Sequence, residues 1–252
     1  INAILKAAEI KEIENDKKGD NAEKDRDKIS SIIDFPNFLM HVLKLYAKKK
    51  SLKDIDVKLN EKFLLSCAEK LFGLKPDEKK VNKFIALLFK CRTLFDRYVI
   101  KVKGVEDNEE FSWVLNKPHK YTYNDKNSVK YDINTYEDES LQSQVIMAQS
   151  MLQVTFRQRI YKNWLQVLLE YLSNETCELQ NIQAEDILRC LHDYMKDHYN
   201  DLGINFDKEI ELQDGQKYAC LNMGVNTPHF LLNFIDYLYW VKQPVLEGKK
   251  GK

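Results

Sequence analysis

The sequence predicts an all-α protein, arranged as a multi-helix array. Hydrophobic residues make up 44% of the 252 positions and recur every three or four residues along most of the chain. Residues that cap helices precede several of these apolar segments. The segment at residues 105–139 loses the helical period, which favours two helical subdomains joined there. The side chains that we expect in the core include Phe38, Phe84, Phe95 and Trp164.

Residues 1–105 are predicted to form a basic N-terminal helical subdomain. Residues 1–13 have helical apolar spacing, whereas residues 16–28 form a charged run whose only apolar residue is Ala22. Because so polar a segment buries too little surface to pack, it predicts a mobile loop. The other helices of this subdomain are expected after the loop.

Capping signals delimit those helices. Asp34 is the predicted N-cap of a helix that carries Pro36 in its first turn, where proline is tolerated. A second apolar face is predicted to end at Gly73, because glycine readily adopts the backbone conformation of a C-cap. Asp77 is the predicted N-cap of the longest helix, which we expect to continue to Gly104.

Residues 106–139 are predicted to form an acidic region rich in aromatic side chains. Trp113 and four tyrosines lie there among Asn, Asp and Glu residues. This composition predicts a loop-rich insertion or a short hairpin around residues 105–139, pinned by the aromatic side chains.

Residues 140–242 are predicted to form a C-terminal helical subdomain, and residues 243–252 a tail. Three helices are expected, at residues 140–155, 160–172 and 184–199. An Asp-Gly pair favours a tight turn, so residues 206–221 are predicted to hold a small hairpin. Thr227 is the predicted N-cap of the last helix, and Pro228 its first residue.

The charges balance overall but are unevenly distributed. The chain carries 39 Lys and Arg residues and 39 Asp and Glu residues. Residues 28–105 hold 18 basic and 8 acidic side chains, whereas residues 106–141 hold 4 basic and 9 acidic ones. The basic segment therefore faces either a polyanion such as DNA or the acidic half of its own chain.

The five cysteines predict a reducing, cytoplasmic environment, because their number is odd and no pair has Cys-x-x-Cys spacing. No run of eighteen apolar residues occurs, so neither a membrane span nor a membrane partner is expected. The chain begins at Ile1 instead of Met and ends in Gly-Lys-Lys-Gly-Lys, which we interpret as features of an excised fragment. The oligomeric state does not follow from these features.

A metal-dependent phosphohydrolase centred on His192 and Asp193 is the weakest function that the sequence suggests. Cys190 and His198 are further conceivable ligands, but Cys190 and His192 lie on different faces of one predicted helix. No second ligand cluster completes the set. We therefore predict no metal, no cofactor and no catalytic residue in this chain.

Seven basic residues are candidates for contact with nucleic acid. They include four of the six arginines of the chain, and the planar guanidinium group suits contact with phosphate or base edges. The candidates are Arg92, Arg97, Lys101, Lys103, Arg157, Arg159 and Lys162. Arg92 and Asp96 lie four residues apart, so a local ion pair is expected between them. The alternative for the whole set is ordinary surface charge at the ends of helices.

Four segments carry a resemblance to a known family, and they follow one another in the family's order. They are residues 33–43 (IDFPNFLMHVL), 92–101 (RTLFDRYVIK), 149–155 (QSMLQVT) and 224–240 (GVNTPHFLLNFIDYLYW). Together they resemble the helical middle region of GmrSD-type restriction proteins, the bacterial modification-dependent (type IV) nucleases. Two motifs of that family are missing: the C-terminal His-x-x-Pro of its nuclease domain and the Asp-Gly-Gln-Gln-Arg of its N-terminal nucleotide-handling domain.

The resemblance implies a non-catalytic interaction or spacer region of a bacterial phage-defence nuclease. Such a region would couple nucleotide-sensing and nuclease domains that this chain lacks, and its partners would be those domains. Asn233, Asp236 and Trp240 are candidates for contact between domains, because they lie off the main apolar face of the last predicted helix. The alternative is a module that binds DNA, without sequence preference, through residues 28–105.

Overall fold

The computed structural model describes residues 28–50, 57–104, 111–123, 126–157, 162–174, 181–201 and 224–242. Within them, seven α-helices carry most of the structure, and five strands form two small antiparallel sheets. The protein is therefore mostly α-helical, as predicted, but it is not all-α, and the three-stranded sheet was not predicted. The predictions for residues 1–13, 206–221 and 243–252 lie outside the described residues, as does all of the predicted loop at 16–28 except Lys28.

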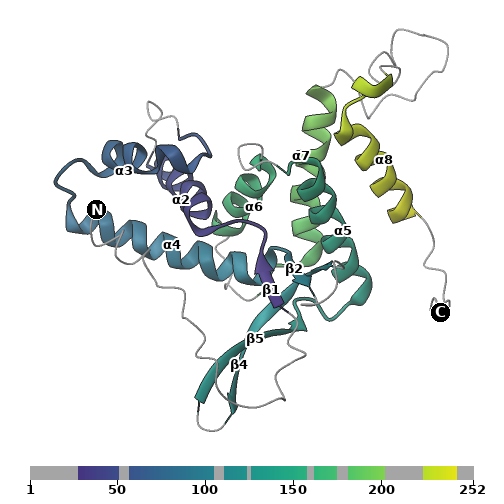
Figure 1. The fold of residues 1–252 in the computed structure, drawn as a ribbon, viewed down its shortest axis with the longest axis horizontal. Helices are drawn as coiled ribbons and strands as arrows, with labels where there is room; N and C mark the ends of the chain where they lie inside the picture. The colour runs from purple at the N-terminus through teal and green to yellow at the C-terminus, as the bar shows by residue number, and fades with distance from the viewer. Residues whose placement is uncertain are drawn as a thin grey trace.

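Three helices form the N-terminal part of the described chain (Figure 1), and two of them, α2 and α4, begin directly after the predicted capping residues. They are α2 (Phe35–Lys49), α3 (Leu64–Phe72), preceded by the short 3-10 helix η1 (Glu61–Phe63), and α4 (Glu78–Tyr98). The Asp34 carboxylate accepts a hydrogen bond from the backbone N–H of Asn37 at 3.0 Å, and Asp77 caps α4 in the same way. Gly73 ends α3 with a φ of 76°, a left-handed conformation that favours glycine.

The predicted end of the longest helix is wrong. Helix α4 ends at Tyr98, and the chain continues as strand β2 (Lys101–Gly104). This strand is the middle one of a three-stranded sheet, between β1 (Lys28–Ser31) and β3 (Phe111–Val114). The β-branched side chains before Gly104 favour extended backbone, and pairing on both edges stabilises it.

The predicted hairpin around residues 105–139 is confirmed. Strands β4 (Asn116–Tyr123) and β5 (Lys126–Asn134) pair as an antiparallel ribbon that points away from the helices (Figure 1). The register shifts between Lys117 and His119, around Pro118, which has no backbone N–H to donate to the ladder. At the base of the ribbon, Thr135 donates its N–H to the Leu115 carbonyl at 3.1 Å.

The C-terminal helices lie within a few residues of their predicted positions. They are α5 (Glu139–Thr155), α6 (Asn163–Asn174), α7 (Ala184–Asp201) and α8 (His229–Lys242), the last preceded by the 3-10 helix η4 (Gly224–Asn226). Helix α8 begins one residue after Pro228 instead of at it. Helix α5 has an N-cap that was not predicted: Asp138 accepts from the backbone N–H of Leu141 at 2.9 Å.

One hydrophobic core extends through the described residues, from Ile33 to Tyr237. The four side chains predicted to be buried, Phe38, Phe84, Phe95 and Trp164, are each 1% exposed or less. Helix α6 lies between α4 and α7, whereas α8 lies at the edge of the helical array, beside α5 and α7 (Figure 1). The division into subdomains stays a prediction. None of the described helices combines the length and apolar character that crossing a membrane requires.

Candidate interaction site

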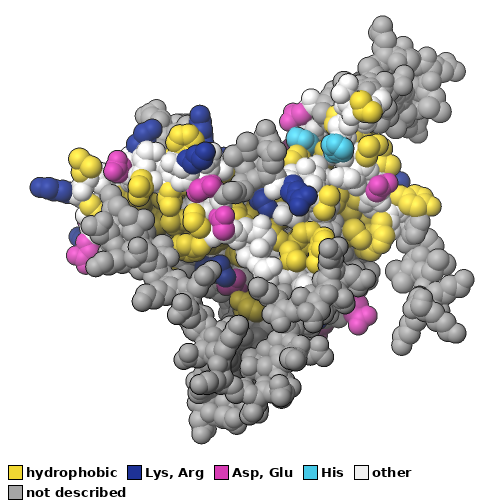
Figure 2. All heavy atoms as spheres, in the orientation of Figure 1, with side chains coloured by type: hydrophobic (Ala, Val, Ile, Leu, Met, Phe, Trp, Pro, Cys, Tyr) yellow, Lys and Arg dark blue, Asp and Glu magenta, His cyan; other side chains and the backbone are white. Residues whose placement is uncertain are grey.

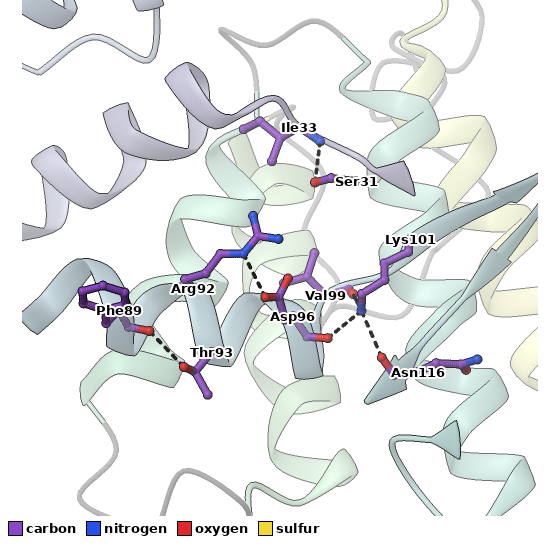
Figure 3. A network of polar contacts seen from close by, with 9 residues as sticks. All are labelled: Ser31, Ile33, Phe89, Arg92, Thr93, Asp96, Val99, Lys101 and Asn116. Atoms are coloured by element: carbon purple, nitrogen blue, oxygen red, sulfur yellow. Dashed lines mark hydrogen bonds and ion pairs between the residues drawn. The ribbon is translucent and has the colours of Figure 1, made fainter. Parts of the chain in front are cut away.

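Lys101, a candidate for nucleic-acid contact, has its ammonium group inside the protein. Its side chain is 4% exposed, and its Nζ donates to the backbone carbonyls of Asp96 (2.6 Å), Val99 (3.2 Å) and Asn116 (3.1 Å) (Figure 3). Burial lowers the pKa of Lys101 to about 8, although the Asp96 carboxylate opposes this shift. Lys101 therefore joins the end of α4 to strand β4 and does not face a phosphate.

Lys162, another of the candidates, has a similar role at the start of α6. Its side chain is 3% exposed, and its Nζ donates to the Ile32 carbonyl at 2.9 Å and to Gln153 Oε1 at 2.8 Å. Burial lowers the pKa of Lys162 to about 8, with Asp34 acting in the opposite direction. The prediction that Lys101 and Lys162 contact phosphate is therefore wrong, because their ammonium groups already donate hydrogen bonds within the chain.

The other basic candidates lie in varied surroundings. The predicted local pair is present, with Arg92 Nε 2.8 Å from Asp96 Oδ2 (Figure 3). Arg92 is exposed, and its guanidinium lies within cation–π range of two aromatic rings. Arg97 and Lys103 are half-buried, Arg157 is exposed, and Arg159 lies outside the described residues. Four of the candidates lie within residues 28–105, and one of them, Lys101, is buried. This removes one of the four contacts on which DNA binding by that segment would depend.

The histidines of α7 pack against α8. His192 Nε2 lies 2.6 Å from Tyr237 Oη, a hydrogen bond between the two helices. The His198 ring meets the rings of Phe156 and Phe230 edge-on, at centroid distances of 5.0 and 4.7 Å. Burial lowers the pKa of both histidines, against the neighbouring carboxylates. Among the described residues, no group of three or more His, Cys, Asp or Glu side chains could hold a metal ion.

The three candidates for contact between domains line one groove. This groove lies between α5 and α8 and has a volume of about 360 Å³. Asn233, Asp236 and Trp240 contribute from α8, and Met147, Met151 and Val154 are among the residues that contribute from α5. The α8 side could be foreseen from helical spacing. The α5 side could not, because nothing local in the sequence indicates which helix packs beside α8.

The two walls of the groove run in opposite directions. Asn233, near the start of α8, donates from Nδ2 to Thr155 Oγ1 at the end of α5, at 2.9 Å. Beyond that contact, the rings of Phe156 and Phe230 stack with centroids 6.0 Å apart. The lining residues span eight positions on either side, so the groove extends along about two turns of each helix.

The groove and the adjoining face of α8 are apolar and exposed. Val154 on α5 is 58% exposed, and three side chains on the outer face of α8 are between 46% and 68% exposed: Leu232, Ile235 and Tyr239. On the face drawn in Figure 2, hydrophobic side chains lie at the surface over α5 and α8. Exposed apolar side chains on neighbouring helices are typical of a site where another protein segment packs.

Asp236 is the one charged side chain among the described residues that line this groove. Its carboxylate is exposed, and no described residue donates a hydrogen bond to it or forms an ion pair with it. The neighbouring polar groups differ, because Asn233 is bonded to Thr155 and Ser150 donates to the Met147 carbonyl at 3.0 Å. The groove therefore combines apolar walls with one unpaired negative charge.

A second hollow, of about 470 Å³, lies beside α6 and α7 and is lined mainly by charged and polar side chains. Several of its charges neutralise each other. Lys48 pairs with Glu170, and Arg189 lies 2.6 Å from Asp186. Although this hollow is larger, its paired charges make it a solvated surface, and the α5–α8 groove is the better candidate for an interaction site.

No protein-family model matches the chain, and neither the curated proteins nor the solved structures include a significant match to it. The chemistry of the groove is therefore the basis on which a role is assigned to it.

Proposed function

We propose that this chain is a non-catalytic helical interaction or spacer region of a GmrSD-like restriction nuclease. In that role it couples nucleotide-sensing and nuclease domains that lie elsewhere in the parent protein, and α8 contacts one of them. The observation that carries the proposal is the α5–α8 groove, because an exposed apolar surface with an unpaired charge is suited to docking.

The positions of three of the four family-like segments support the proposal. Residues 149–155 and 224–240 contribute the two walls of the groove, from α5 and α8. Residues 92–101 are tied to α5 through the amide of Gln149, which donates to the Tyr98 carbonyl at 2.9 Å and accepts from the Ile100 N–H at 3.1 Å. Two of these segments form the groove, and the third holds α5 in place. We expect a region that couples domains to keep such segments together.

The test is association with the neighbouring part of the parent protein. The region that follows Lys252 in the parent reading frame would be produced as a separate polypeptide and titrated against this chain by calorimetry. We expect a one-to-one complex that is weakened about tenfold or more by Val154→Asp, because Val154 is exposed in the groove and a charge there would enter an apolar interface. Leu74→Asp is the matched control, because Leu74 is 83% exposed and lies after α3, far along the chain from the groove. No association at about 100 µM would overturn the proposal.

The prediction that this chain has no turnover of its own can be tested separately. The purified protein would be incubated with magnesium or manganese, with modified and unmodified phage DNA, and with GTP. We expect neither DNA cleavage nor nucleotide hydrolysis above the buffer rate. Turnover that a single substitution in this chain abolishes would contradict a non-catalytic role.

A further inference from the structure

The shape of the α5–α8 groove fits a helix. Met147, Met151 and Val154 lie at positions i, i+4 and i+7 of α5, and the lining residues of α8 have matching spacing. Two antiparallel helices that present such rows form a channel into which the side chains of a third helix pack. Seven steps along a helix rise by about 10 Å, so about two turns of the third helix would be in contact.

The lining of the groove suits varied apolar side chains. Met147 and Met151 have flexible, polarisable thioethers that adapt to the partner's shape. Trp240 supplies aromatic surface on the opposite wall, above the buried ring of Tyr237, and aromatic residues are enriched where proteins bind each other. Trp240 is still 37% exposed, so a docked helix would cover surface that is now in water.

Asp236 defines the charge of the occupant. An apolar helix laid over this carboxylate would remove it from water without compensation, which is strongly unfavourable. A lysine or arginine opposite Asp236 would remove that penalty and form a charge-assisted hydrogen bond. Because Asp236 lies between Asn233 and Trp240 along α8, the basic residue must lie at the middle turn, with apolar residues one turn to either side.

The same charge argues against a second copy of this chain as the occupant. Helix α8 spans His229–Lys242, so its midpoint falls at Ile235 and Asp236. Two copies packed antiparallel about that midpoint would bring two Asp236 carboxylates together, and like charges at an apolar contact repel.

We propose that the α5–α8 groove binds one amphipathic helix of a partner protein, through apolar side chains at helical spacing and one lysine or arginine that pairs with Asp236. The inference rests on the proposed function only in that it specifies what docks against α8.

Peptide selection tests the inference while the partner is still unidentified. A phage-displayed library of random peptides about 16 residues long, enough for four turns, would be selected on the full chain. We expect enriched peptides with apolar residues at helical spacing around one lysine or arginine. A parallel selection on the Asp236→Lys protein should enrich an acidic residue at that position. Enrichment without helical spacing, or of the same motif by both proteins, would overturn the inference.

Binding of the selected peptides is measured through Trp240. A docked helix should shift its emission to shorter wavelength, and Trp240→Phe should remove that signal, because Trp164 is fully buried and Trp113 lies on β3. Replacing the basic residue of the peptide by glutamate should weaken binding about tenfold, and Asp236→Lys should reverse this preference. An unchanged preference, or a dimer in sedimentation that occludes the groove, would overturn the inference.

The two proposals fail in different ways. Selected peptides that bind the groove while the adjoining polypeptide does not associate would overturn the coupling role alone. Association of the adjoining polypeptide that Asp236→Lys leaves unchanged would overturn the helix-binding inference alone. Circular dichroism of each variant confirms that it is folded before its binding is interpreted.

Discussion

The corner where α4 meets β2 and the groove between α5 and α8 each hold a charged side chain among apolar neighbours. At the corner, Lys101 is 4% exposed and has three carbonyl acceptors, all from this chain. In the groove, Asp236 is exposed and has no partner among the described residues. Since an unpaired charge is costly to bury, the corner is complete within the chain, whereas the groove can close only if an outside group neutralises Asp236.

The largest expected effect on stability comes from removing the Lys101 ammonium group at the corner between α4 and β2. Lys101→Met keeps an apolar stem of similar length but removes the donor from three carbonyls, so we expect the free energy of unfolding to fall by about 3 kcal/mol. Lys103→Met, on the same strand but half-buried, is the control and should cost less than about 1 kcal/mol. Urea denaturation followed by circular dichroism measures both. Equal losses would show that the buried ammonium group has no special role.

A second buried group makes stability depend on pH. His41 is 1% exposed, its Nδ1 lies 2.8 Å from Gln166 Oε1, and burial lowers its pKa from 6.5 to about 4. The unfolded chain therefore binds a proton more readily than the folded one. The stability that depends on neutral His41 is complete above pH 6.5 and falls by about 3 kcal/mol as the pH decreases to about 4.

The measurement compares the native protein with His41→Gln, whose amide can still bond to Gln166. The unfolding free energies of both proteins are determined from pH 7 to pH 4. Carboxylates that titrate in this range affect the two proteins alike, so the difference between their slopes reports His41. Parallel pH profiles would contradict the assignment.

A smaller effect is expected at the seam between α7 and α8, next to the groove. Tyr237→Phe removes the hydrogen bond to His192 and should lower the free energy of unfolding by about 1 kcal/mol. Tyr239→Phe is the matched control, because Tyr239 is 68% exposed, and should have no measurable effect. Hydrogen exchange of α8 should increase in the first variant only. Faster exchange in both would mean that the tyrosine hydroxyls do not distinguish the two faces of α8.

How far the sequence predicts this structure depends on how local each feature is. The caps at Asp34 and Asp77 could be predicted because the partner of each carboxylate lies two or three residues away. The end of α4 could not, because strand β2 depends on pairing with residues 28–31 and 111–114. The β-branched residues before Gly104 give only a local preference for extended backbone, and pairing with distant segments decides it.

The same reasoning applies to the candidate site. The sequence favours surface positions for Lys101 and Lys162 because lysine is rarely buried, and only distant acceptors, such as the Ile32 carbonyl for Lys162, place it inside. The spacing of Asn233 and Asp236 correctly placed them on one side of α8. That Met147 and Met151 form the opposite wall is a consequence of tertiary packing, for which the sequence contains no local signal.

The smallest expected effect on stability is at Asp236. Its carboxylate is exposed and has no partner among the described residues, so Asp236→Asn keeps the shape of the side chain and leaves no donor unsatisfied. We expect the free energy of unfolding to change by less than about 0.5 kcal/mol, the range of ordinary surface substitutions. Urea denaturation at pH 7, beside Lys101→Met, measures it. A loss above about 1 kcal/mol would show that Asp236 is already paired within the folded chain. In that case the groove would resemble the corner between α4 and β2, because its charged side chain would already be paired within the chain. No unpaired charge would then be available to a partner.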